Sequence, residues 1–252
     1  MYHHCSCNLD IELASKVQQL LFPKSPPACS WACIGVKYHM ADALGGDYFD
    51  FITLPDGCQA LFVGDVTGHG VHASVVMALL YGFIHHSARG ECDPEDLVRQ
   101  ANAFLRTFAD RSEKFDHYFS STLFYCAIDP ASYRLHYVNA GHPAPMVRRG
   151  EEVLHLEVNA PPIGFFEQPE ITLGSFQLQR HDRLLLFTDG ITETFDPEQQ
   201  CFGRARLTEL LRGHQGDHLE FLDLLYAELK EFGADSALSD DCTAIVLDLH
   251  QF

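Results

Sequence analysis

The chain has 252 residues, of which 46% are hydrophobic, and its formal net charge is −18. That length is sufficient for one large domain or two small ones with a substantial core. The negative charge argues against nucleic acid and anionic membrane surfaces, both of which attract basic patches, and is compatible with a bound cation or a basic partner. No uncharged run is long enough to span a membrane, and the N-terminus lacks the regions of a signal peptide, so we expect a cytoplasmic protein.

The nine cysteines do not indicate a disulfide framework. Their number is odd, they are scattered, and a chain of this length can form a core without cross-links. Cys5 and Cys7 beside His3 and His4 offer a soft-metal site as an alternative, but a single Cys-x-Cys near a chain end is a weak signal, and the role of residues 3–7 stays open. The other cysteines are expected to be small core residues.

Residues 1–27 are predicted to form an N-terminal tail, an amphipathic helix and a Pro-rich linker. Asn8 or Asp10 can cap a helix that runs to about Leu21, and Pro23 ends it. Five residues share its apolar face: Ile11, Ala14, Val17, Leu20 and Leu21. Packing of this face on the chain's own domain is the favoured expectation, and pairing with a partner is the alternative.

From residue 28 on, strands dominate and come mostly as hairpins. Strands are expected at 31–40, around 48–51, and at 60–63, 119–128, 133–138, 171–178, 183–187 and 242–249. Helices are expected at 71–86, from Asp93 to about 108, at 204–211 and at 217–232, the last with a capping box from Asp217 and Glu220. Because the helices fall in pairs between groups of strands, the pattern predicts an α+β layered domain over residues 28–252.

Acidic residues recur at the ends of these strands. Asp47 follows Gly45-Gly46, Asp65 follows a buried strand and precedes a glycine-rich turn, Asp189 follows an apolar strand, and Asp240-Asp241 introduce the last one. One such acid, Asp65 included, is compatible with an ordinary turn that caps a helix. Four are better explained by convergence on one site, where their mutual repulsion would raise their pKa values unless cations lay between them. Oxygen ligands without a His/Cys cluster favour Mg²⁺ or Mn²⁺, and two such ions can activate a water for attack on a phosphate ester.

The ordered motifs of the chain resemble those of the SpoIIE/RsbU-type serine/threonine phosphatases, the bacterial branch of the metal-dependent protein phosphatase (PPM) superfamily. The motifs are residues 43–50 (Ala-Leu-Gly-Gly-Asp-Tyr-Phe-Asp), 65–70 (Asp-Val-Thr-Gly-His-Gly), 139–143 (Asn-Ala-Gly-His-Pro), 187–193 (Phe-Thr-Asp-Gly-Ile-Thr-Glu) and 240–243 (Asp-Asp-Cys-Thr). The similarity covers about residues 10–250, and the segment 18–23 of the first helix also resembles the family.

The resemblance implies an αββα sandwich of two antiparallel sheets flanked by helices, with a two-metal site between the sheets. It implies that the metal ligands are Asp47, Asp65, the Val66 carbonyl, Asp189 and Asp240, which act through a metal-bound water. The ions would be Mn²⁺ or Mg²⁺, with a third ion left open. Asp50, His69 and Asp241 are expected just outside the direct ligands, with a purely structural role open for Asp50 and His69.

Three further positions of the family motifs are expected to be structural. Asn139 and His142 are expected to hold a turn, and Glu193 to fix the loop after Asp189. One departure from the family pattern is His181, at a position where the family usually has Gly, and we expect it to alter only the turn.

By this resemblance the chain is a Mn²⁺- or Mg²⁺-dependent phosphoserine/phosphothreonine phosphatase, acting on a STAS-type anti-anti-sigma factor or a similar partner-switching protein. A phosphoprotein-binding scaffold with little turnover and a metallophosphatase for small phosphate esters are the alternatives. Because no sensor domain precedes residue 28, regulation is expected through a separate protein or a second copy at residues 10–21. The sequence leaves the exact substrate, the regulator, the preferred metal and the oligomeric state undetermined.

Overall fold

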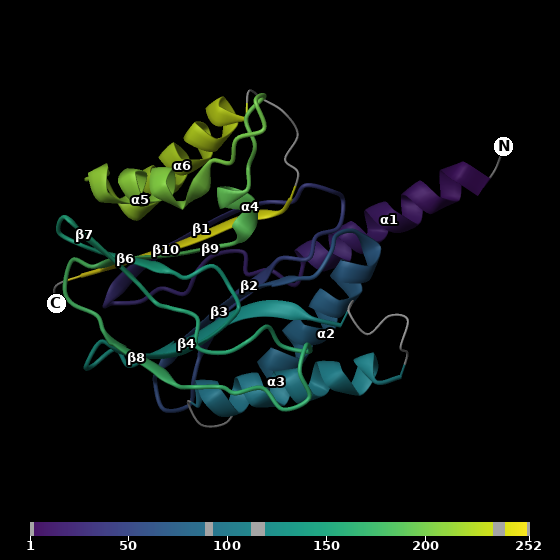
Figure 1. The fold of residues 1–252 in the computed structure, drawn as a ribbon, viewed down its shortest axis with the longest axis horizontal. Coiled ribbons are helices and arrows are strands. Elements are labelled where there is room, and N and C mark those ends of the chain that lie inside the picture. Colours follow the sequence, from purple (N-terminus) through teal and green to yellow (C-terminus); the bar gives the residue numbers. More distant parts are fainter. Residues whose placement is uncertain (1–2, 89–92, 112–118, 234–239, 251–252) are drawn as a thin grey trace.

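Two five-stranded antiparallel sheets lie face to face in the computed structural model, which describes residues 3–88, 93–111, 119–233 and 240–250 (Figure 1). The first sheet has the order β1-β10-β9-β6-β7 and the second the order β2-β3-β4-β5-β8. The strands of the first sheet are β1 (Ala32–His39), β6 (Met146–Arg149), β7 (Glu152–His155), β9 (Arg183–Phe187) and β10 (Cys242–Leu249). Those of the second are β2 (Tyr48–Thr53), β3 (Gln59–Val66), β4 (Ser121–Ile128), β5 (Arg134–Ala140) and β8 (Gly174–Gln177).

A pair of helices covers the outer face of each sheet. Helices α2 (Val71–Ser87) and α3 (Pro94–Ala109) lie against the second sheet, and α5 (Gly203–Gly213) and α6 (His218–Phe232) lie against the first (Figure 1). Asp93 caps α3, and the capping box of Asp217 and Glu220 begins α6 as the sequence predicts. The predicted α+β sandwich is confirmed.

The inner strand β9 is apolar from Leu184 to Phe187 because both of its faces are buried. In β9, Leu184 and Leu186 pack in the core between the sheets, whereas Leu185 and Phe187 pack under α5 and α6. This alternation places successive side chains in two different cores, as the two-residue period of a strand requires. An unbroken apolar run followed by an acid therefore marks a strand that leads from the interior to one edge of the sandwich.

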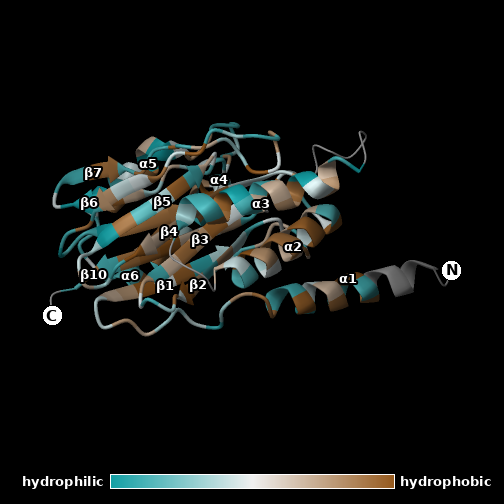
Figure 2. Cartoon of the chain, turned by 90° about the horizontal axis from the view of Figure 1, so that it is seen from below, coloured by the Kyte–Doolittle hydropathy of each residue, from teal (hydrophilic) through white to brown (hydrophobic). Residues whose placement is uncertain are grey.

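Helix α1 (His3–Gln19) differs from its prediction in two respects. It begins ahead of the expected caps Asn8 and Asp10, because no Pro or Gly interrupts the residues before them. Of its expected apolar face, Ala14, Val17 and Leu20 are exposed, Ile11 is half-buried, and Leu21 packs against the core. The helix therefore packs on its own domain at its C-terminal end, and most of the expected face is left open. The N-terminal part of the helix projects beyond the other labelled helices and strands (Figure 2). The side chains of residues 3–8, which include the Cys-x-Cys, lie outside the described part of the chain.

Smaller differences concern element ends. Strand β3 extends through Asp65 to Val66, β8 is shorter than expected, and the short helix α4 (Asp189–Thr192) was not expected. His181 takes the left-handed conformation, with φ of 69°, that glycine adopts without strain. Among the described residues, no helix combines the length and the apolar character that crossing a membrane demands. The division of the chain after residue 27 stays a prediction.

Candidate metal centre

The acidic strand ends of both sheets meet at one edge of the sandwich. Asp47 precedes β2 and Asp65 lies near the end of β3, and these strands pair so that Tyr48 faces Gly64. Asp189 follows β9 and Asp240 precedes β10, and these strands pair so that Phe187 faces Ala244. The four expected carboxylates therefore come from two adjacent strands of each sheet.

Asp47 connects the two sheets. Its Oδ2 accepts hydrogen bonds from the hydroxyls of Thr188 at 2.9 Å and Thr243 at 2.6 Å, both from the opposite sheet. Burial raises the pKa of Asp47 well above its ordinary value, and the charges of Asp65 and Asp241 raise this pKa further, while the two hydroxyls oppose the shift. The carboxylate is thus fixed in position but is poorly stabilised as an anion by the protein alone.

Asp65 and the carbonyl of Val66 point at the same place, above Gly46. A Cβ atom on Gly46 would lie 3.0 Å from Asp65 Oδ1 and 3.1 Å from the Val66 carbonyl oxygen. Burial, followed by the charges of Asp189, Asp240 and Asp241, raises the pKa of Asp65 to about 8. Two predicted oxygen ligands therefore converge where only glycine leaves sufficient room.

Asp241 holds the turn that carries Asp47. Its Oδ1 accepts from the amide of Ala41 at 2.9 Å, and its Oδ2 accepts from the amide of Gly46 at 2.8 Å. A Cβ atom on Gly45 would come within 2.3 Å of Asp241 Oδ2, which explains the first glycine of the Gly-Gly pair. Both carboxylate oxygens of this buried acid are engaged by main-chain amides, as suits a residue outside the direct ligands.

Asp189 and Asp240 lie at the more open side of the cluster. Burial raises the pKa of both, the charge of Glu193 raises that of Asp189, and the charge of Asp189 contributes to that of Asp240. Because Asp65 is affected by both of them and Asp47 by Asp65, the four acids form one electrostatic unit.

The donor set fits a hard divalent cation. It consists of carboxylate and carbonyl oxygens, which Mg²⁺ and Mn²⁺ prefer, and its carboxylates have raised pKa values, which a cation between them would lower. Within the described ranges, no three His, Cys, Asp or Glu side chains are already gathered closely enough to hold an ion. The ligand assignment stays a prediction that these observations support.

Two of the three outer residues lie where they make other contacts. Asp50 Oδ2 accepts hydrogen bonds from Tyr81 and from His85 Nε2, so Asp50 joins β2 to α2. His69 is exposed, its Nδ1 is 3.5 Å from Asp42, and its charge lowers the pKa of Asp240. These contacts agree with a structural role for Asp50 and with a position of His69 beside the acids, and both roles stay predictions.

The remaining motif residues stabilise turns. Asn139 donates to the Leu156 carbonyl and accepts from the amide of His142. His142 is buried and bonded to Thr122, and burial lowers its pKa to about 3, so it is neutral. Glu193 is exposed, and its amide donates to the Asp189 carbonyl.

Sequence reasoning assigned no role to four residues that position this site. Thr188 directly precedes Asp189, and Thr243 lies two residues after Asp241. A hydroxyl so close to a motif acid is a signal by which the sequence could have indicated both residues. Ser121 donates to the Asp65 carbonyl at 2.6 Å, and Gln18 of α1 donates to the Gly45 carbonyl at 2.7 Å and accepts from the Gly45 amide at 3.2 Å. Gln18 is a buried polar residue on an otherwise exposed helix, which only the structure reveals.

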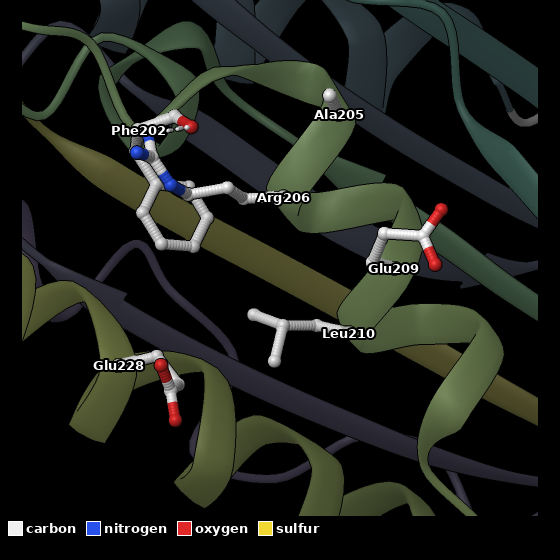
Figure 3. Close-up of a pocket in the computed structure, with 6 residues that line it drawn as sticks. All are labelled: Phe202, Ala205, Arg206, Glu209, Leu210 and Glu228. Atoms are coloured by element: carbon white, nitrogen blue, oxygen red, sulfur yellow. Dashed lines mark hydrogen bonds between the residues drawn. The ribbon is translucent and has the colours of Figure 1, made fainter.

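A groove lies between α5 and α6 (Figure 3). Its volume is about 460 Å³, and it is lined by Phe202, Ala205, Arg206, Glu209, Leu210 and Glu228. Arg206 is already engaged, since it donates to the carbonyls of Cys201 and Phe202 and lies over the ring of Phe232. None of the predicted ligands lines this groove.

Comparison with known proteins identifies the family. The family model described as Stage II sporulation protein E (SpoIIE) matches residues 55–250. The chain belongs to the SpoIIE family. RsbP of Bacillus subtilis, named a phosphoserine phosphatase, is 29% identical over 223 residues, which cover 88% of this chain and 51% of RsbP. Protein IcfG of Synechocystis is 28% identical over 267 residues, covering 95% of this chain and 41% of IcfG. The chain thus spans about half of these relatives.

Solved structures agree with the fold of this SpoIIE-family chain. The SiaA-PP2C domain of Pseudomonas aeruginosa superposes with a TM-score of 0.85 at 20% identity, covering 98% of this chain and 99% of that domain. RsbX, solved in complex with magnesium, superposes with a TM-score of 0.64 at 15% identity, covering 88% of this chain and 98% of RsbX. The resemblance to SpoIIE/RsbU-type phosphatase domains is confirmed, and the names of RsbP and of RsbU of Bacillus subtilis agree with the expected protein phosphatase.

Proposed function

We propose that this chain is a metal-dependent protein serine/threonine phosphatase that hydrolyses phosphoserine or phosphothreonine. The observation that carries the proposal is the electrostatic unit of Asp47, Asp65, Asp189 and Asp240, assembled from strand ends of both sheets. Structural acids are usually paired with cations or amides, whereas these acids raise one another's pKa values.

Asp47, Asp65, the Val66 carbonyl, Asp189 and Asp240 would hold Mn²⁺ or Mg²⁺. When bound, such ions polarise a phosphate ester and lower the pKa of a water that attacks it. The protein's own contribution is positional: Asp241 fixes the turn of Asp47, the hydroxyls of Thr188 and Thr243 orient its carboxylate, and Ser121 holds the Asp65 carbonyl. The magnesium in RsbX supports a divalent cation here, and the choice between Mn²⁺ and Mg²⁺ is part of the test.

The proposed substrate is a phosphorylated STAS-type partner-switching protein. Its support is the similarity to RsbP and RsbU, both named phosphoserine phosphatases. The test is phosphate release from a phosphoserine STAS protein, with and without Mn²⁺ or Mg²⁺, by the wild type and by Asp65→Asn and Asp189→Asn. We expect metal-dependent release that both substitutions reduce at least about 100-fold, by analogy with loss of other electrostatic groups that stabilise a transition state.

Asp129→Asn is the matched control, because Asp129 is a partly exposed turn acid at the opposite end of β4. Activity that survives both site substitutions would refute the ligand assignment. Release from small phosphate esters alone would favour the small-ester alternative. Metal binding by calorimetry with binding of the phosphoprotein and no turnover would favour the scaffold.

We also propose that helix α1 regulates this site through a second copy or a regulatory protein. The exposed apolar residues of α1 give a partner a surface, and Gln18 connects the same helix to Gly45, two residues before Asp47. Deleting residues 1–22 should change both the oligomeric state or partner binding and the activity. Gln18→Ala should change the activity alone, because it leaves the exposed residues intact. Unchanged activity in both variants would refute regulation through α1.

A further inference from the structure

Two adjacent phenylalanines are exposed in the connection between β7 and β8. Phe165 is 60% exposed and Phe166 50%, and their rings pack edge to face with centroids 5.1 Å apart. Large aromatic side chains gain free energy from burial, so a contiguous exposed pair is a candidate contact surface.

The backbone beneath these rings is firmly held. Asn102 of α3, itself buried, accepts from the amide of Gly164 at 2.8 Å and donates to the Phe166 carbonyl at 3.0 Å. Gly164 has a φ of 83°, and a Cβ atom there would lie 2.0 Å from the Phe119 carbonyl oxygen. The backbone of the loop is thus fixed by hydrogen bonds and close packing, and in this conformation the two rings are exposed.

Backbone pairing connects this loop to the metal centre. The amides and carbonyls of Ser121 and Ile163 bond reciprocally, at 3.0 and 2.9 Å. Ser121 also pairs with Val66 across β3 and β4, and its hydroxyl donates to the Asp65 carbonyl. Ile163 is therefore two strand spacings, or about 10 Å, from Val66. The exposed rings begin two residues further along the loop.

We propose that Phe165 and Phe166 bind an apolar side chain next to the phosphorylated residue of a protein substrate, and so determine specificity. This inference rests on the proposed phosphatase function. The acid cluster would engage only the phosphate through its cations, and the two rings supply an uncharged contact at its border. Aromatic residues on a rigid support are typical anchors of protein contacts, since little conformational entropy is lost when they bind.

The size of the surface favours a substrate side chain over a second copy of the chain. A phenylalanine buries at most about 150–250 Å². A stable protein interface buries about 800 Å² on each partner, which two half-exposed rings cannot supply. A transient contact with a substrate segment needs much less area.

The test compares two phosphoserine peptides that differ only in the residues flanking the phosphoserine, leucine in one and alanine in the other. With Mn²⁺, the wild-type full chain should show a kcat/KM about 10-fold higher for the leucine peptide, as expected for partial burial of one apolar side chain. The double variant Phe165→Ala/Phe166→Ala should lose this preference, mainly through a higher KM for the leucine peptide. Leu173→Ala is the matched control, because Leu173 is exposed in the same connection but adjoins the outer strand β8, and it should keep the preference.

A wild type that hydrolyses p-nitrophenyl phosphate but does not distinguish the peptides would overturn the inference and leave the phosphatase function standing. An equal loss on both peptides in the double variant would also overturn it, because the rings would then support the site only indirectly. A wild type that hydrolyses none of the three compounds would overturn the phosphatase function, and the inference with it. Light scattering that shows a dimer in the wild type and a monomer in the double variant would assign the rings to a second copy.

Discussion

At the scale of single residues, the centre depends on groups that bind no substrate. Asp47 is buried between the sheets, and both hydroxyls that contact it come from the sheet that does not carry it. Its position is therefore a consequence of how the sheets are docked. Thr188 and Thr243 therefore support the position of an expected ligand, although neither has a charge.

Thr243→Val removes one of the two donors to Asp47 at nearly constant volume. We expect a loss of roughly 1–3 kcal/mol in the free energy of unfolding without metal, because a buried acceptor loses a partner. We also expect about 10–100-fold weaker Mn²⁺ binding, the usual effect of removing a group that orients a ligand. Urea unfolding and calorimetric titration measure the two effects. Thr243→Ser should restore both, and Thr107→Val on the exposed face of α3 should change neither.

The raised pKa of Asp65 predicts a pH-dependent stability of the metal-free protein. Its pKa is about 8 in the folded chain and about 3.9 in an unfolded one, so the folded state binds more protons between these values. The stability that protonated Asp65 contributes is present at low pH and is lost as the pH rises towards 8. The opposite contribution of buried His142, with a folded pKa of about 3, is complete above about pH 6.5.

Thermal unfolding between pH 6.5 and 8 without metal should therefore show a decline in the wild type that is smaller in Asp65→Asn. Added Mn²⁺ should reduce the decline in the wild type, because the ion stabilises the charged carboxylates. Equal slopes for the two proteins would contradict the raised pKa.

At the scale of elements, the strand ends supply the acids, and two helices hold the neighbouring turn and loop by hydrogen bonds. Helix α1 contacts the turn of Asp47 through Gln18, and α3 holds the loop of Phe165 and Phe166 through Asn102. Each helix thus reaches one border of the centre with a single buried amide side chain.

Asn102→Ala leaves the amide of Gly164 without its side-chain acceptor. We expect a loss of about 1–3 kcal/mol in the free energy of unfolding, since a donor in a packed environment becomes unsatisfied. Limited proteolysis should also cleave near residues 164–167 faster than in the wild type. Gln100→Ala is the control, because Gln100 lies on the same helix but is exposed. Unchanged cleavage in Asn102→Ala would show that other contacts hold the loop.

Most elements were predictable because their signals are local. The alternation of apolar residues predicts the strands, and the capping box of Asp217 and Glu220 predicts the start of α6. The acids were predictable because charges at the ends of buried strands are conspicuous. The positions of Gln18, Asn102 and the two threonines were not, because hydrogen bonds between segments far apart in the chain leave no periodic trace. The exposure of α1 was missed because an amphipathic pattern indicates a buried face without saying what buries it.

At the scale of the whole molecule, the net charge of −18 opposes the compact state, and the cluster of acids at the metal centre adds a local repulsion. The core between the sheets and the two helical layers must offset this repulsion. Salt reduces the repulsion between exposed charges, and bound cations reduce it at the centre, so the two effects should be separable.

Raising NaCl from about 20 to 200 mM should increase the Tm by about 2–4 °C, if screening contributes about 1 kcal/mol. KCl should act equally, since screening does not depend on the identity of a monovalent ion. Asp65→Asn should retain most of this response and lose most of the additional stabilisation by micromolar Mn²⁺. A Tm that falls with NaCl would show that favourable ion pairs outweigh the repulsion.

The bond between Asp47 and Thr243 closes a loop of 196 positions, and among the described strands β10 is the one partner of β1. During synthesis at about 5–20 residues per second, about 10–40 s pass between the appearance of these two residues. Throughout that interval β1 lacks its partner β10, and the turn of Asp47 lacks its hydrogen bonds to Asp241 and Thr243. We therefore expect a nascent chain to lack the proposed phosphatase activity until β10 takes its place between β1 and β9.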